Sequence, residues 1–195
     1  MVSWPLRWCL WLACVALFAS GDLGGGPLHE AAEKGDPQLM WTQLFKGGKV
    51  NSLDALYRTP LHVVASSSTT TGDLSDMLIM YGSDTEARDN EDKTPLHWAA
   101  MYGNVGVATS LLNKGADINA QDSHGWSAIH FAASEGHEPM VRLLVQRMCN
   151  VELRTSKGTL AVDMAAQAEH GALASWLASQ GTAVPRPRKP MVPQE

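Results

Sequence analysis

The 195-residue sequence is short of charge, of basic residues and of cysteine, and each shortage excludes a class of protein. Charged residues make up 18% of the chain, while 45% is hydrophobic, so the chain can bury a core and is not of the disordered type. Its net charge is −5, and no basic stripe runs through its body. We therefore expect no nucleic-acid partner, because such partners are met by clustered Lys and Arg.

The chain has three cysteines, and two of them, Cys9 and Cys14, lie in an apolar leader. If the leader is removed, Cys149 stands alone and no intramolecular disulfide can form. No Cys/His group has the spacing of zinc ligands. We expect Cys149 to be a packed structural residue and predict no metal site.

Familiar catalytic motifs are missing as well. The sequence has no Gly-rich phosphate loop, no Gly-x-Ser-x-Gly and no His-Glu-x-x-His. Asp89, Glu91 and Asp92 form a short acidic run, which we expect at a solvated loop tip rather than in a catalytic pair. The sequence thus predicts no catalytic or cofactor-binding residue, and an enzyme remains the remote alternative.

Residues 1–21 have the layout of a secretory signal. One positive charge, Arg7, precedes an uninterrupted apolar stretch from Trp8 to Ala19, and small residues follow up to Gly21. The stretch is shorter than the roughly 20 residues that a transmembrane helix needs. The pattern predicts a cleavable signal and an extracellular or periplasmic address. An uncleaved membrane anchor and a cytoplasmic location are the alternatives.

The rest of the chain is an internal repeat. A Pro-Leu-His motif or its variant recurs at spacings of 33, 35, 33 and 33 residues, beginning at Pro27, Pro60, Pro95, Ala128 and Ala161. A pair of small residues follows each motif. This pattern resembles the ankyrin repeat, which implies an all-α solenoid of helix–turn–helix units with protruding loop or hairpin tips. We number the five expected repeats 22–54, 55–89, 90–122, 123–155 and 156–182.

The physical chemistry of repeat 3 accounts for its residue choices. Thr94 can cap the first helix with its hydroxyl group, and Pro95 fits the first helical turn, where its missing N–H is not needed. Leu111 and Leu112 give the second helix an apolar stripe toward the neighbouring repeat. Gly115 can end that helix in a left-handed conformation without steric cost.

Histidine recurs in the motif as His29, His62, His97 and His130, and Asp163 takes the place in the last repeat. A catalytic or metal-binding histidine would not be copied into four repeats and then replaced. The resemblance implies that each histidine is hydrogen-bonded to its turn and to the next repeat. We therefore interpret this histidine column as framework.

The chain departs from the pattern in three places. Thr42 and Gln43 stand where the second helix of repeat 1 should be apolar, which predicts a polar terminal cap. The Ser/Thr run 66–71 holds the two extra residues of repeat 2, so the first helix there should end early, in a longer connection. Segment 183–195 is rich in Pro and basic residues and is expected to be an extended, disordered tail.

The resemblance implies a non-catalytic protein-binding module, an adaptor, scaffold or inhibitor, whose partner meets the concave face and loop tips of repeats 2–4. We expect a monomer that binds another protein and contacts a membrane only if the leader is retained. Aromatic residues on a rigid surface are typical of interface hot spots, although the same aromatics could serve mainly in packing. The candidate partner-binding residues are Arg58, Val63, Lys93, Trp98, Met101, Tyr102, His124, Trp126, Phe131 and Glu135.

Overall fold

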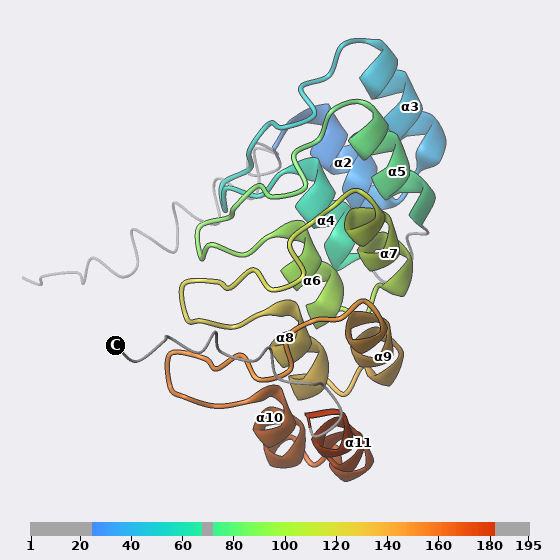
Figure 1. Ribbon diagram of the computed structural model, residues 1–195. Helices are drawn as coiled ribbons and strands as arrows, with labels where there is room; N and C mark the ends of the chain where they lie inside the picture. The colour runs from blue at the N-terminus through green and yellow to red at the C-terminus, as the bar shows by residue number, and fades with distance from the viewer. Residues whose placement is uncertain (1–24, 68–71, 182–195) are drawn as a thin grey trace, which may run out of the picture.

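The computed structural model describes residues 25–67 and 72–181, and this part of the chain forms ten α-helices in antiparallel pairs (Figure 1). The all-α repeat solenoid expected from the sequence is confirmed. In chain order the helices are α2 (Gly26–Lys34), α3 (Pro37–Phe45), α4 (Pro60–Ser66), α5 (Gly72–Met80), α6 (Pro95–Met101), α7 (Val105–Asn113), α8 (Ala128–Ser134), α9 (Glu138–Gln146), α10 (Ala161–Gln167) and α11 (Gly171–Gly181).

The helices form two layers, with long loops projecting to one side (Figure 1). The even-numbered helices stack on one another and lie next to the loops, whereas the odd-numbered helices form the outer layer. Within the described residues, β-structure is limited to one antiparallel bridge between Gln121 and Ser127. The projecting loops are therefore held mainly by turns rather than by paired strands.

Helix boundaries follow the local sequence. In repeat 3, Thr94 lies at the N-cap of α6 with extended backbone, and Pro95 occupies the first helical turn. Gly115 follows α7 with a φ of +89°, the left-handed conformation that the sequence predicted. Thr59 and Ser127 are likewise the N-cap residues of α4 and α8, with extended backbone.

The core runs along the whole stack between the two layers. Small residues such as Ala99 and Ala100 are fully buried in the inner helices, which lets neighbouring repeats approach closely. Leu111 of α7 and Leu144 of α9 are fully buried, as the apolar stripe predicts, while Leu112 is only partly buried. The core is therefore continuous from one repeat to the next.

Two expectations about single repeats need correction. Helix α4 ends at Ser66 and is as long as α6 and α8, at 7 residues each, so it does not end early. In repeat 1, Thr42 is exposed as expected, but Trp41 and Phe45 of the same helix are also exposed, at 52% and 79%. That terminal repeat is therefore not a simple polar cap.

Three parts of the sequence-based interpretation lie outside the described residues: the signal at 1–21, most of the Ser/Thr run at 68–71, and the tail at 183–195. Among the helices that are described, none has the length and apolar character needed to cross a bilayer.

Candidate functional site

The histidine column forms the frame behind the loops. The Nδ1 atom of His97 lies 2.9 Å from both the backbone N and the hydroxyl oxygen of Thr94. Its Nε2–H reaches forward to the carbonyl oxygens of Ala120 and Trp126, at 3.0 and 3.1 Å. His97 therefore ties its own helix start to the loop of the next repeat, as the resemblance implied.

Burial determines the charge state of this column. Desolvation lowers the pKa of His97 to about 4, and it also lowers the pKa values of His62 and His130. These imidazoles are thus neutral at physiological pH. A neutral ring can accept a hydrogen bond at Nδ1 and donate one at Nε2, which is the pattern that the frame requires.

Each of the first three loop tips is closed by an aspartate. Asp89 accepts hydrogen bonds at 2.9 Å from the backbone N–H groups of Glu91 and Lys93. Asp54 and Asp122 occupy the same register in their own loops and make matching bonds. Asp89 is only 7% exposed, so the expectation that it is a solvated charge was wrong. Its carboxylate satisfies backbone donors that the turn leaves unpaired.

Backbone hydrogen bonds also join each loop tip to the next. The carbonyl oxygen of Leu56 accepts from the N–H of Asn90 at 3.2 Å, and that of Glu91 accepts from Ser123 at 3.1 Å. A third bond of this kind continues the series to the fourth tip. The four tips therefore form a rigid row, which limits the conformational entropy that a binding partner would have to suppress.

Trp98 is the centre of an aromatic cluster between the first and second loops. Its indole N–H donates to Asp89 at 2.8 Å, and its ring stacks on Tyr102 with 6.0 Å between centroids and 5° between planes. The Arg58 guanidinium lies 5.4 Å from the Trp98 centroid and the Lys93 ammonium lies 5.9 Å from it. These distances are within the range of cation–π attraction.

Lys93 links this cluster to a second aromatic pair. Its ammonium also lies 5.8 Å from the ring of Phe131, which packs against Trp126 with 4.9 Å between centroids. Phe131 further meets His97 edge to face at 5.8 Å. The second pair is thus anchored on the histidine frame.

The two cations of the cluster are already paired. Arg58 forms an ion pair of 2.8 Å with Asp54, and Lys93 forms one with Glu91. Partial burial of Asp54 favours a higher pKa, but hydrogen bonds from the backbone and side chain of Arg58 lower that pKa overall. The cluster therefore presents aromatic faces and neutralised pairs rather than free positive charge.

The structure brings six of the ten candidate residues together: Arg58, Lys93, Trp98, Tyr102, Trp126 and Phe131. They differ in accessibility. Tyr102 is 45% exposed, and Trp98 and Trp126 are half-buried, whereas Phe131 is buried at 7%. Phe131 supports the surface from below and does not form part of it.

The other four candidates are more dispersed. Val63 is only 4% exposed and belongs to the core. Met101 is half-buried, and its carbonyl oxygen lies 3.0 Å from Nε2 of His137. His124 and Glu135 are exposed, but in the described part of the chain no recorded contact joins them to the aromatic cluster.

Sequence reasoning missed the residues that organise and extend this surface. Asp54 and Asp89 could have been found by aligning the loops, since an aspartate precedes the motif at the same distance in three repeats. Leu56 and Tyr57 form an exposed apolar tip beside Arg58, at 46% and 60%. Tyr57 also has a φ of +60°, which is unfavourable for a bulky side chain.

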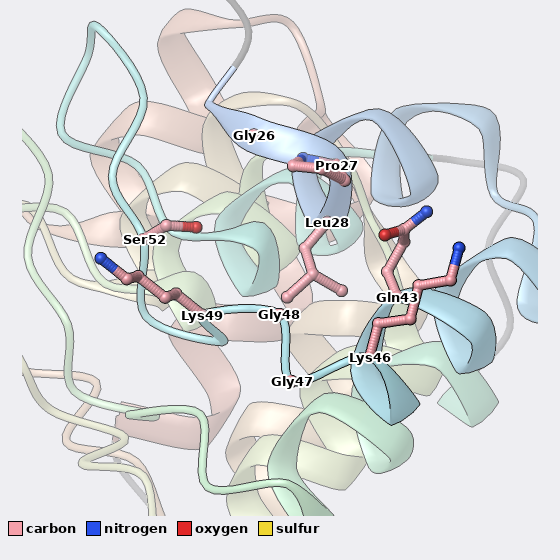
Figure 2. Close-up of a pocket in the computed structure, with 9 residues that line it drawn as sticks. All are labelled: Gly26, Pro27, Leu28, Gln43, Lys46, Gly47, Gly48, Lys49 and Ser52. Atoms are coloured by element: carbon pink, nitrogen blue, oxygen red, sulfur yellow. The ribbon is translucent and has the colours of Figure 1, made fainter.

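An open pocket of about 270 Å³ lies at the N-terminal end of the stack (Figure 2). Leu28 reaches into it from α2, and Gln43 and Lys46 come from the end of α3. None of the ten candidate residues lines it. The pocket is lined by Gly26, Pro27, Leu28, Gln43, Lys46, Gly47, Gly48, Lys49 and Ser52.

Residues 25–67 and 72–181 offer few groups that could bind a metal ion or react. No group of three or more His, Cys, Asp or Glu side chains in these segments could hold a metal ion. Cys149 is buried, and desolvation raises the pKa of its thiol to about 12. Cys149 is thus a packed residue, as expected, with little thiolate at neutral pH.

Comparison with known proteins agrees with this architecture. A family model described as "Ankyrin repeats (3 copies)" matches residues 28–122 and 121–187. The chain is also similar to the inactive serine/threonine-protein kinase TEX14 of Bos taurus, with 34% identity over 86 residues. That alignment covers 44% of this chain but 6% of the kinase-like relative. The family match spans most of the described stack, and the chain belongs to the ankyrin repeat family.

Proposed function

We propose that this protein is a non-catalytic binding module whose partner docks on the concave face and loop tips of repeats 2–4, centred on Trp98 and Tyr102. Ankyrin repeats are in general protein-interaction modules, which supports the binding class. The parallel Trp98–Tyr102 stack is the observation that favours this surface as the binding site. One of its rings is half-buried and the other is 45% exposed.

The environment of the stack suggests how it would bind. Trp98 is fixed by its bond to Asp89, and the loops on either side are joined by backbone hydrogen bonds. A preordered aromatic surface loses little side-chain entropy on association. Because Arg58 and Lys93 are paired internally, we infer that a partner contributes an apolar or aromatic anchor rather than a strongly acidic segment.

The test compares capture of partners by wild-type and variant proteins in the native host, by proximity labelling and quantitative mass spectrometry. Tyr102→Ala is the main variant, because Tyr102 is exposed and its removal leaves the frame intact. Trp98→Phe is the second, since it removes the bond to Asp89 but keeps a ring. We expect both to lose most specific partners, by about tenfold or more for a hot-spot residue.

Met148→Ala is the matched control, because Met148 is 82% exposed and lies outside the cluster. It should leave the captured set unchanged. Circular dichroism and urea unfolding must show that all three variants remain folded. Unchanged capture by folded Tyr102→Ala and Trp98→Phe proteins would rule out this surface as the binding site.

We also propose that residues 1–21 direct the protein into the secretory pathway and are then removed, with an uncleaved anchor or a cytoplasmic protein as the alternatives. The support is the charge and apolar pattern of that segment. N-terminal sequencing of a C-terminally tagged protein from its host tests this. A start near Asp22 is expected, and a start at Met1 would contradict cleavage.

A further inference from the structure

The outer layer of repeats 1 and 2 carries an exposed apolar patch, made of Trp41 and Phe45 on α3 with Met80 and Tyr81 at the end of α5. Phe45 and Met80 are 79% and 77% exposed, and Trp41 and Tyr81 are 52% and 39% exposed. We call this group the outer patch. It lies on the layer that faces away from the loops, so it is separate from the concave surface (Figure 1).

The ankyrin scaffold does not require this patch. Aligned by the left-handed residue after the outer helix, which is Gly47, Gly82, Gly115 or Met148, Phe45 and Met80 correspond to Asn113 and Gln146 in repeats 3 and 4. Tyr81 corresponds in the same way to Lys114 and Arg147. The last position of the outer helix is thus large and apolar in repeats 1 and 2 and polar in repeats 3 and 4, while the next position is apolar in repeat 2 alone and basic in repeats 1, 3 and 4.

The patch is ordered and large. Trp41 and Tyr81 meet edge to face across the two helices, with 6.0 Å between ring centroids and 89° between planes. Large side chains of this kind offer about 150–250 Å² each, so the exposed fractions together amount to roughly 500 Å². That lies within the roughly 300–600 Å² of the largest apolar patch on a typical soluble protein, which is often functional, and it is over half of the roughly 800 Å² that each partner buries in a standard interface.

In place of the monomer expected from the sequence, we propose that the outer patch is a self-association surface. Two copies of this chain pair on it by a two-fold axis, with α3 and α5 antiparallel to those of the partner copy. A two-fold interface places the same surface on both sides, so the surface must be complementary to itself. The distribution of charge around the outer patch meets that condition.

Charges of opposite sign flank the patch on different helices. Lys46 follows α3 directly and is exposed, and Asp76 is exposed one turn before Met80 on α5. Neither makes an ion pair within residues 25–67 and 72–181. In an antiparallel pair, the Lys46 end of one copy meets the acidic side of α5 in the other. The opposed helix dipoles favour the same arrangement.

A second copy fits these charges better than a lipid surface does. An interfacial lipid-binding helix typically surrounds its apolar face with Lys and Arg. The outer patch instead has Asp73 and Asp76 exposed on α5, and carboxylates would be repelled by anionic lipid. The concave surface remains free in such a dimer, so this proposal does not depend on the function proposed above.

The experiment measures the mass of the protein, purified as its host processes it, by sedimentation velocity and light scattering up to about 0.1 mM, where even a weak dimer is populated. The variants Phe45→Asn and Met80→Gln install the side chains of repeats 3 and 4. Met148→Gln is the control, since Met148 is equally exposed but lies elsewhere. We expect dimerisation of the wild type and the control, and at least about tenfold weaker dimerisation of the patch variants.

Charge-reversal variants distinguish binding of a second copy of this chain from binding of a lipid or of another protein. Lys46→Asp and Asp76→Lys should each weaken the homodimer, and mixing the two variants should restore a heterodimer, which contains one native and one reversed charge pair. A wild-type protein that stays monomeric at about 0.1 mM overturns the proposal. So does a dimer insensitive to the patch variants, as association through the leader would be. Binding to phosphatidylcholine vesicles that is lost in Phe45→Asn, without a dimer, would assign the patch to membranes instead.

Discussion

The outer helices of repeats 1 and 2 end in exposed apolar side chains, whereas those of repeats 3 and 4 end in polar and basic ones. Phe45 and Met80 occupy the same register as Asn113 and Gln146, on helices of equal length. The fold therefore tolerates either chemistry at these positions. The repeat frame therefore sets the position of a side chain, while the identity of that side chain can be selected for interactions outside the frame.

The histidine column shows a second contrast between the ends and the middle of the stack. His97 has partners at both ring nitrogens, but Nδ1 of His29 is buried without a hydrogen-bond partner among the residues that the structure describes. The physical reason is local: repeat 1 has Gly26 where repeats 2 and 3 have Thr59 and Thr94. Gly26 has no hydroxyl group to offer, and its φ of +45° differs from the extended backbone of Thr94, whose N–H also donates to His97. The first repeat therefore lacks both of these donors.

The largest expected effect comes from removing a histidine of the complete frame. His97→Ala leaves the N–H of Thr94 and the carbonyl oxygens of Ala120 and Trp126 unpaired and opens a cavity. It should lower the free energy of unfolding by about 3–4 kcal/mol. His29→Ala should cost less, about 2 kcal/mol, because only the bond to Arg58 is lost. Urea unfolding measures both, and equal losses would refute the contrast.

The second largest effect on the free energy of unfolding is expected from low pH, which protonates the buried histidines. The pKa of His97 is near 6.5 in the unfolded chain and about 4 in the folded one, so the unfolded chain binds more protons below pH 6.5. The contribution of the neutral His97 ring to stability is thus fully present above pH 6.5 and is lost as the pH falls toward 4. At about 1.4 kcal/mol per pKa unit, this loss amounts to about 3 kcal/mol.

This acid effect is measured as the urea midpoint between pH 7.5 and pH 4.5. His97→Ala should make the dependence shallower without removing it, because the pKa values of His62 and His130 are lowered as well. A wild-type midpoint that does not move over this range would contradict the neutral buried column.

Each of the first three loop tips has one residue with left-handed backbone. Substitutions there should change the free energy of unfolding by an intermediate amount, with opposite signs in the first and third loops. Gly125 has a φ of +75°, and an added Cβ would lie 2.7 Å from the backbone nitrogen of Ser156. Gly125→Ala should therefore destabilise the fold by about 2 kcal/mol. Tyr57 occupies this position in the first loop, so Tyr57→Gly should stabilise by about 0.5–1 kcal/mol. Thermal unfolding checks both, with Asp92→Gly as a further comparison.

The smallest effect is expected on the outer face. Phe45→Asn should change the unfolding free energy of the monomer by less than about 0.5 kcal/mol, because the side chain is 79% exposed. The exchange in the other direction, Asn113→Phe with Gln146→Met, should be similarly mild for stability. It should create a second patch and raise association. A large loss of stability in either case would mean that these positions belong to the core.

The repeat frame was predictable from the sequence because it depends on local, periodic chemistry. The spacing of the motif predicted the helix pairs, and Gly115 was correctly assigned to a left-handed helix end. The framework role of His97 followed from its recurrence. Each of these features depends on residues within one repeat or on the equivalent motif of the next repeat. A single sequence is therefore enough to predict them.

The accessibility of individual side chains was much less predictable. Val63 and Phe131 were taken as candidate surface residues, yet both are buried by neighbouring repeats. Asp89 was taken as solvated, yet it closes a turn and accepts from Trp98. The exposure of a side chain depends on how far the adjacent loop and helix extend over it. The periodic pattern of the sequence does not predict this extent.

The all-α solenoid, its period and most helix boundaries followed from the sequence alone, because they depend on side chains within one turn of the backbone that they affect. The end of α4 was an exception. Which aromatic side chains are exposed depended instead on how the repeats pack together. This packing stacked Trp98 on Tyr102, covered Phe131, and left Phe45 and Met80 uncovered on the outer layer. The physical reason is that exposure is a property of the packed stack, where each surface is shaped by the repeats on both sides.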